Sequence, residues 1–224
     1  MKCSGRFAFA ASAILTSVTL VGCGEPASES VVSQLAPSKA KSSPVAPVKP
    51  EPQSHEVRKE VTPVDETGVP QVFLTSDHSA MCRVRVGDQL PAITLPQLTG
   101  GQTELDSLRG DKATVVLFWQ EDPWMSATAL KDLSTDIVPS DEVAVVGIAV
   151  KSGESDIQTL LNEAGAKFPQ LLDNDGKVFN QVGMVKLPRV YVLDATGKIA
   201  WFDLEYSEST RRELKQTLEA LTGK

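Results

Sequence analysis

The chain has 224 residues, of which 41% are hydrophobic and 23% charged, and its formal net charge is −7. This size and composition are typical of a soluble protein with one ordinary domain or two small ones, and they exclude a large multidomain enzyme. The acidity is uneven, because residues 84–224 carry 14 Lys and Arg against 21 Asp and Glu. Since an acidic domain repels phosphate backbones, we expect no nucleic-acid partner.

The N-terminus has the features of an export signal. Basic residues precede an apolar run over residues 7–21, which is too short to span a bilayer. The run ends in Leu-Val-Gly-Cys at residues 20–23, which resembles the lipobox of bacterial lipoproteins. We therefore expect a signal peptide over residues 1–22 and a lipid anchor on Cys23, which would hold the exported chain on a bacterial membrane facing the periplasm or the exterior. The alternative is an ordinary cleaved signal in which Cys23 is incidental.

Residues 23–83 predict an extended tether. Eight of the 14 prolines lie between residue 24 and residue 70, among many Ser, Ala, Lys and Glu. Such a segment cannot bury enough apolar surface to offset the entropy lost on ordering. We therefore place the folded domain at residues 84–224.

The domain begins with an α/β pattern. Residues 115–119 and 143–150 are continuous apolar runs, which are typical of strands covered on both faces. Apolar residues recur at helical spacing over 125–137 and 157–164, so a helix follows each strand. This order predicts a parallel βαβ unit with a right-handed crossover.

The last part of the chain predicts antiparallel pairing. A Gly-containing turn at 194–197 separates two apolar runs, 189–193 and 198–202, and a final amphipathic helix follows at 207–221. A small extra hairpin is expected around Gly100 and Gly101, before the first long strand. The predicted fold class is α/β, with a mixed central sheet, helices on both faces and an extra N-terminal hairpin.

Several segments, taken in this order, resemble the thioredoxin-like redoxin family. They are Val86–Pro91, Leu105–Gly110, Val115–Trp119, Leu187–Asp194 and Gly197–Ile199. The resemblance is to membrane-tethered thiol–disulfide oxidoreductases of the TlpA and ResA type, with the alkyl hydroperoxide reductase and thiol-specific antioxidant proteins as relatives. It implies a thioredoxin fold over nearly all of the domain.

The catalytic Cys-x-x-Cys pair of that family is absent. The aligned positions hold Pro123, Trp124, Met125 and Ser126, and no alternative register provides a thiol. Ser126 or Thr128 could act as a nucleophile only beside a base, and the domain contains no His; otherwise Ser126 is a small residue on a helix. Because exchange needs sulfur on both partners, the resemblance implies a degenerate member that has lost dithiol exchange.

The resemblance also implies a binding groove. Pro188 aligns with the family's cis proline, which leaves nearby backbone free to pair with an extended substrate. Trp124, Met125, Leu187 and Pro188 would then converge to form an apolar contact surface. The alternative is that Trp124 packs only on its own sheet.

The remaining polar candidates have simpler explanations. Glu121 and Asp122, just before a helix, are more simply capping carboxylates than a general acid–base pair. Residues 173–176, Asp-Asn-Asp-Gly, are too compact for a calcium loop and predict a turn. His55 and His78 have no Cys partner at zinc spacing. We expect no metal and no cofactor.

Cys82 is the thiol that remains once Cys3 leaves with the signal and Cys23 is acylated, so an intrachain disulfide is impossible. Arg83 and Arg85 flank it, and their positive charge favours a thiolate. Cys82 is therefore either a redox-active or intermolecular thiol, or a small apolar residue partly buried at the edge of the domain.

Three functions fit these observations. The first is a lipid-anchored redoxin-like module that binds or assembles a protein partner without dithiol catalysis. The second is an active thiol–disulfide oxidoreductase or peroxide-reducing protein that uses Cys82 or a partner thiol, so the sequence leaves enzyme activity open. The third is a structural envelope protein in which the domain serves as a spacer.

Overall fold

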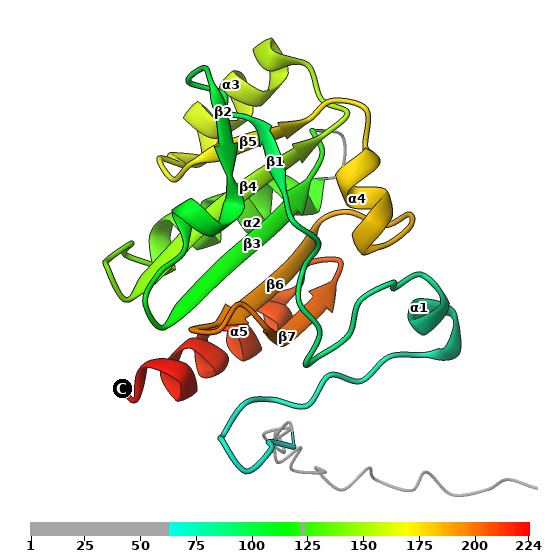
Figure 1. Ribbon diagram of the computed structural model, residues 1–224, viewed down its shortest axis with the longest axis vertical. Helices are drawn as coiled ribbons and strands as arrows, with labels where there is room; N and C mark the ends of the chain where they lie inside the picture. Colours follow the sequence, from blue (N-terminus) through cyan, green and yellow to red (C-terminus); the bar gives the residue numbers. More distant parts are fainter. Residues whose placement is uncertain (1–62, 122–123) are drawn as a thin grey trace, which may run out of the picture. The chain divides into compact units, whose positions relative to one another are not determined.

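A mixed five-stranded sheet forms the centre of the fold (Figure 1). The computed structural model describes residues 63–121 and 124–224. Strand β3 (Ala113–Trp119) lies between parallel β4 (Val143–Val150) and antiparallel β6 (Arg189–Asp194), and β5 (Gln170–Asp173) and β7 (Ile199–Leu204) form the edges. The strands predicted at 115–119, 143–150, 189–193 and 198–202 are confirmed, with the last one shifted slightly toward the C-terminus.

Each face of the sheet has its own apolar core. Successive residues of β3 point to opposite faces, so Val115 and Leu117 belong to one core and Val116 and Phe118 to the other. The first core packs against α2 (Trp124–Asp136), α3 (Glu154–Ala164) and α5 (Glu208–Thr222). The second packs against α4 (Lys177–Val182), the short 3-10 helix η1 (Leu105–Leu108) and the hairpin of β1 (Thr94–Pro96) and β2 (Gln102–Glu104). Both the helices on two faces and the extra N-terminal hairpin are confirmed.

Local signals explain where the longer helices start and stop. Gly165 ends α3 in the left-handed conformation at φ 67°, as the sequence predicted. Ser207 caps the start of α5: its side-chain oxygen accepts the backbone N–H of Thr210, and the Thr210 hydroxyl oxygen accepts the backbone N–H of Ser207. None of the described helices combines the length and the apolar character that crossing a bilayer requires.

Residues before position 84 contribute to the folded unit. Val69 and Cys82 are 4% and 7% exposed and belong to the two cores, and α1 (Ser76–Ala80) begins at a Thr75 cap. All described residues belong to one compact unit. The boundary predicted between residues 83 and 84 therefore falls inside this unit, because apolar side chains of the preceding segment find partners on the sheet. The signal peptide, Cys23 and most of the predicted tether lie outside the described residues.

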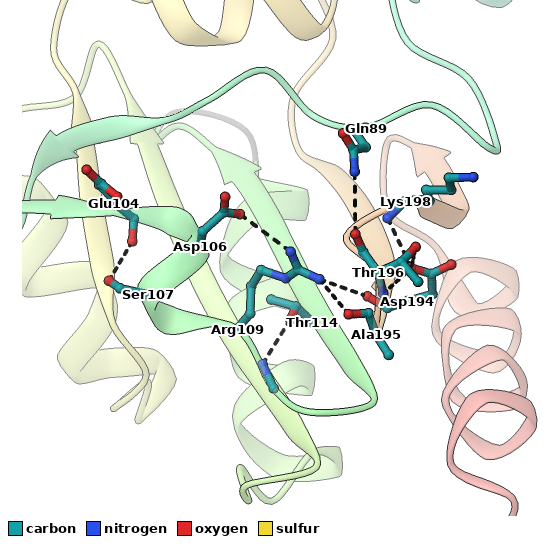
Figure 2. Close-up of polar contacts among 11 residues, drawn as sticks. Gln89, Glu104, Asp106, Ser107, Arg109, Thr114, Asp194, Ala195, Thr196 and Lys198 are labelled. Carbon is teal, nitrogen blue, oxygen red and sulfur yellow. Dashed lines mark hydrogen bonds and ion pairs between the residues drawn. The ribbon is translucent and has the colours of Figure 1, made fainter.

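The segment before β3 is fixed to the far turn of the β6–β7 hairpin (Figure 2). Arg109 donates to the carbonyl oxygens of Ala195 and Asp194 at 2.8 and 3.5 Å and lies 3.6 Å from the carboxylate of Asp106. Gly197, at φ 84°, lets the guanidinium approach, because a Cβ there would lie 2.5 Å from it. The Leu105–Gly110 stretch therefore anchors the hairpin that carries β6.

Candidate functional site

The candidate site lies where β3 ends and β6 begins. The Leu187–Pro188 peptide bond is cis, as the resemblance implied. Phe118 is paired with Arg189 in the sheet, so the residues that follow β3 and those that precede β6 lie at the same end of the sheet. The parallel neighbour β4 also ends there, and the carboxyl ends of parallel strands are where α/β proteins commonly bind ligands.

A cavity of about 450 Å³ opens at this end of the sheet. Val150, Phe179 and Leu187 give it apolar walls, and Gln120, Lys151 and Lys186 supply polar groups. Its size is within the range of small-ligand sites, and the mixture of apolar walls and a few polar groups is typical of them.

All four residues that were expected to converge are among the described residues. Leu187 lines the cavity, whereas Trp124 and Met125 do not. Trp124 is 73% exposed at the start of α2, so it does not pack on its own sheet. Met125 packs against the core beneath α2, and Pro188 is buried. Pro123, the first position aligned with the family's Cys pair, and the neighbouring Asp122 lie outside the described residues.

Neither hydroxyl near the start of α2 is arranged for nucleophilic attack. Ser126 is 0% exposed, and its Oγ lies 3.5 Å from the backbone nitrogen of Gln120, which donates to it. The Thr128 hydroxyl donates to the carbonyl of Trp124 at 3.3 Å. Glu121 has one buried carboxylate oxygen without a partner among the described residues. No base among the described residues contacts either hydroxyl.

Comparisons with known proteins identify the family. Residues 86–202, more than half of the chain, match the model of the AhpC/TSA family. The chain belongs to the AhpC/TSA family. It is 26% identical over 151 residues to the thiol-disulfide oxidoreductase ResA of Bacillus thuringiensis, an alignment that covers 62% of this chain and 80% of that protein.

Solved structures confirm the thioredoxin fold. A Bacteroides thetaiotaomicron protein that has been assigned as a disulfide isomerase aligns with a TM-score of 0.58 at 23% identity, over 64% of this chain and 94% of that one. A secreted Mycobacterium tuberculosis disulfide oxidoreductase aligns with a TM-score of 0.52 at 22% identity, over 58% and 96%. The predicted fold class is therefore confirmed.

This family member has a buried arginine directly after its cis proline, which the sequence analysis missed. Arg189 is 0% exposed, and the centre of its guanidinium lies 5.3 Å from the Phe179 ring centroid. It donates to the carbonyl of Met81 at 3.2 Å and to three carbonyls of the loop at 184–186. No described carboxylate pairs with it. The sequence did contain a hint, because Arg189 is a cation at the start of an otherwise apolar strand. A cation buried there needs hydrogen-bond acceptors from elsewhere in the fold.

Cys82 lies beside this arginine and away from the start of α2. Its thiol donates to the carbonyl of His78 at 3.3 Å, and its sulfur is 3.9 Å from Nη1 of Arg189. Arg85, expected to act on the thiol, donates instead to the Ser79 carbonyl at 2.6 Å. Cys82 belongs to the core opposite the one beneath α2. Its burial agrees with the interpretation of a small apolar residue.

Tyr191 completes the buried polar group around Arg189. Its hydroxyl has no hydrogen-bond partner among the described residues. Burial raises the pKa of Tyr191, and the nearby Arg189 guanidinium opposes that change.

The acidic turn at 173–176 caps a helix. The Asp173 carboxylate accepts the backbone N–H groups of Val178 and Phe179 at 3.2 and 2.8 Å. Asp175 pairs with Lys177, and this hydrogen bond lowers the pKa of the carboxyl. Within residues 63–121 and 124–224, no group of three or more His, Cys, Asp or Glu is arranged to hold a metal ion. The prediction of a turn is confirmed.

Proposed function

We propose that this AhpC/TSA-family chain is exported, is anchored to a bacterial membrane through Cys23, and binds a protein partner at the edge beside cis-Pro188 without dithiol exchange of its own. The observation that carries the proposal is that cysteine is missing from the positions aligned with the family's Cys pair. The positions aligned with the family's Cys pair hold Pro, Trp, Met and Ser, and Cys82, the one cysteine among the described residues, is 7% exposed.

The surface around the cavity supports a binding role. Trp124, Val185 and Met184 are 73, 71 and 40% exposed, although each is a large apolar side chain. All three lie in the segments that leave β3 or approach β6, at the same end of the sheet. Exposed Trp and Met are typical of protein-interaction surfaces.

The alternative function, thiol or peroxide chemistry at Cys82, has one supporting contact. The Arg189 guanidinium near the sulfur would stabilise a thiolate or an oxyanion. Against it, a buried thiol meets oxidants and partner disulfides slowly. We therefore favour binding.

One experiment separates the two functions. Insulin reduction and hydrogen peroxide consumption are measured with the purified full chain, and again with Cys82→Ser. We expect rates near the background reaction for both proteins. Turnover that is lost in Cys82→Ser would establish the enzyme, and turnover retained in that variant would also contradict the proposal.

The second arm of the experiment tests the binding surface. The full chain is used to capture membrane proteins, and wild type is compared with Trp124→Ser and with Val138→Ser, a control at the other end of α2 where Val138 is 83% exposed. Loss of a central Trp contact commonly costs roughly tenfold in affinity or more. We expect the Trp124 variant alone to lose the specifically captured protein. Equal capture by all three proteins would remove the binding surface from the proposal.

The proposed anchor rests on the Leu-Val-Gly-Cys motif at residues 20–23. The ResA and M. tuberculosis relatives are named as oxidoreductases, and the latter as secreted, which agrees with export. Intact-mass analysis of the membrane-extracted chain should give a product that starts at Cys23 and carries acyl chains. An unmodified Cys23 would refute the anchor.

A further inference from the structure

The loop before cis-Pro188 turns its carbonyl groups toward the interior. The carbonyl oxygens of Met184, Val185 and Lys186 accept hydrogen bonds from the Arg189 side chain at 2.6, 3.0 and 3.1 Å. Because Arg189 is fully buried and bonded to four carbonyls in all, its guanidinium cannot release them without losing charge-assisted bonds. The orientation of these peptide groups is therefore fixed by the core.

The same peptide groups must direct their N–H bonds the other way. In a planar trans peptide the C=O and N–H bonds are antiparallel. The backbone N–H groups of Val185, Lys186 and Leu187 consequently point away from Arg189, and none has an acceptor among the described residues. Val185 and Lys186 hold φ angles of 51° and 54°, in the left-handed region that residues other than glycine rarely adopt. All three residues line the cavity.

The cavity also contains an uncompensated positive charge. Lys151 lines it and has no ion-pair partner among the residues that the structure describes, whereas Lys186 is paired with Glu205 at 2.7 Å. The stem of Lys151 lies against Gly176, where a Cβ would come within 2.5 Å of it. The domain is acidic overall, but charges further than about 8 Å away are largely screened at physiological salt, so the local groups decide.

We infer that this cavity binds a carboxylate group, carried by a partner next to an apolar side chain, through the three outward N–H groups and Lys151. Successive backbone N–H groups form nests that bind anions, and one uncompensated ammonium matches a single negative charge. The apolar walls of Val150, Phe179 and Leu187 receive the neighbouring side chain. The inference rests on the proposed function, because it names the chemistry by which the partner is recognised.

The carboxylate could come from a chain terminus or from an acidic side chain, and three probes distinguish these sources. They are N-acetyl-Leu-Phe as the free acid, the same dipeptide as its C-terminal amide, and N-acetyl-Glu-Phe amide. Each is titrated at millimolar concentration into the ¹⁵N-labelled full chain, and backbone amide shifts are followed by NMR. We expect shifts at Val185, Lys186 and Leu187 with at least one carboxylate probe and not with N-acetyl-Leu-Phe amide.

Two substitutions should move the affinity in opposite directions. Lys151→Gln removes the unpaired ammonium and should weaken the carboxylate probe roughly fivefold. Glu205→Gln frees Lys186 from its partner and should strengthen binding by a smaller factor. Lys131→Gln, at an exposed lysine on α2, is the matched control and should leave the affinity unchanged.

Equal binding of acid and amide, shifts confined to other residues, an unchanged affinity in Lys151→Gln, or no binding at all would each overturn the inference. These results differ from failure of the proposed function, which is measured by capture. If Trp124→Ser abolishes capture while Lys151→Gln does not, the binding surface stands and the carboxylate site falls. If neither variant affects capture, both proposals fail.

Discussion

At the scale of single residues, Arg189 joins the N-terminal segment to the loop that shapes the cavity. It binds the carbonyl of Met81 on one side and those of residues 184–186 on the other. Its Nε and Nη2 groups donate to these carbonyl oxygens, and its Nη1 lies 3.9 Å from the Cys82 sulfur. Carbonyl acceptors and an aromatic ring against its face stabilise a guanidinium that has no carboxylate partner. Gly183 provides the space, because a Cβ there would overlap the guanidinium.

We therefore expect Gly183→Ala to be destabilising although its backbone is extended, at φ −170°, and accepts any residue. Forcing a methyl group against a fixed buried side chain typically costs about 1–3 kcal/mol. Urea denaturation of the full chain measures the change. Gly153→Ala is the control, because φ is −75° and the nearest atom is the Asp156 carboxylate at 3.1 Å. Equal losses in the two variants would show that Arg189 moves aside freely.

Sequence patterns predicted single residues well where a residue type has one dominant role. Gly165 is an example, since a glycine directly after a helical pattern has few alternatives, whereas the cis peptide bond at Pro188 was expected from the family resemblance alone. Sequence patterns did not predict polar side chains that are buried against residues distant in the chain. Arg189 is satisfied by carbonyls that lie far away in sequence, at Met81, or in an irregular loop. The resemblance placed Trp124 at the groove; its 73% exposure shows that it does not pack on its own sheet, and its contact with a partner stays a prediction.

At the scale of elements, sequence patterns predicted the long helices and strands and the short β1–β2 hairpin, but missed α1, β5 and α4. Strand β5 escaped because Gln170 and Asp173 are polar in a four-residue strand, yet both are at most 4% exposed. Gln170 accepts the indole N–H of Trp119 at 3.0 Å and fills the space that Gly147 leaves open, while Asp173 caps α4. Their burial follows from partners on other elements, so no local pattern in the sequence could reveal it.

The segment before residue 84 shows the same limit. The composition of residues 23–83 favours an unfolded tether, because Pro, Ser, Lys and Glu are frequent there. Two of its apolar residues, Val69 and Cys82, are nevertheless buried, and the backbone of Arg83 donates to the carbonyl of Val182. Composition describes the average of the whole segment. The exposed edges of a sheet can nevertheless be covered by a few individual residues of such a segment.

At the scale of the whole molecule, an ion pair connects two helices that pack on the same face of the sheet. Arg211 of α5 donates to the Asp136 carboxylate of α2 through two nitrogens, at 2.5 and 2.7 Å, and lies 3.3 Å from Asp132. The Arg211 hydrogen bond lowers the pKa of Asp136 in the folded state. The ionised carboxylate therefore stabilises the fold above the ordinary Asp pKa of about 4, and this contribution is lost as the pH falls through the lowered folded-state value.

Arg211→Met should consequently lower the urea midpoint modestly near neutral pH, by an amount within the range of surface ion pairs. In acid, the difference in urea midpoint between the variant and wild type, the stability gap, should disappear. High salt should shrink the same gap at neutral pH, because exposed charges are screened. Arg212→Met is the control, since the neighbouring arginine is more exposed and lies 3.7 Å from Glu213 on its own helix. A gap that is independent of pH would mean that Arg211 stabilises the α2–α5 contact through its aliphatic stem rather than through Asp136.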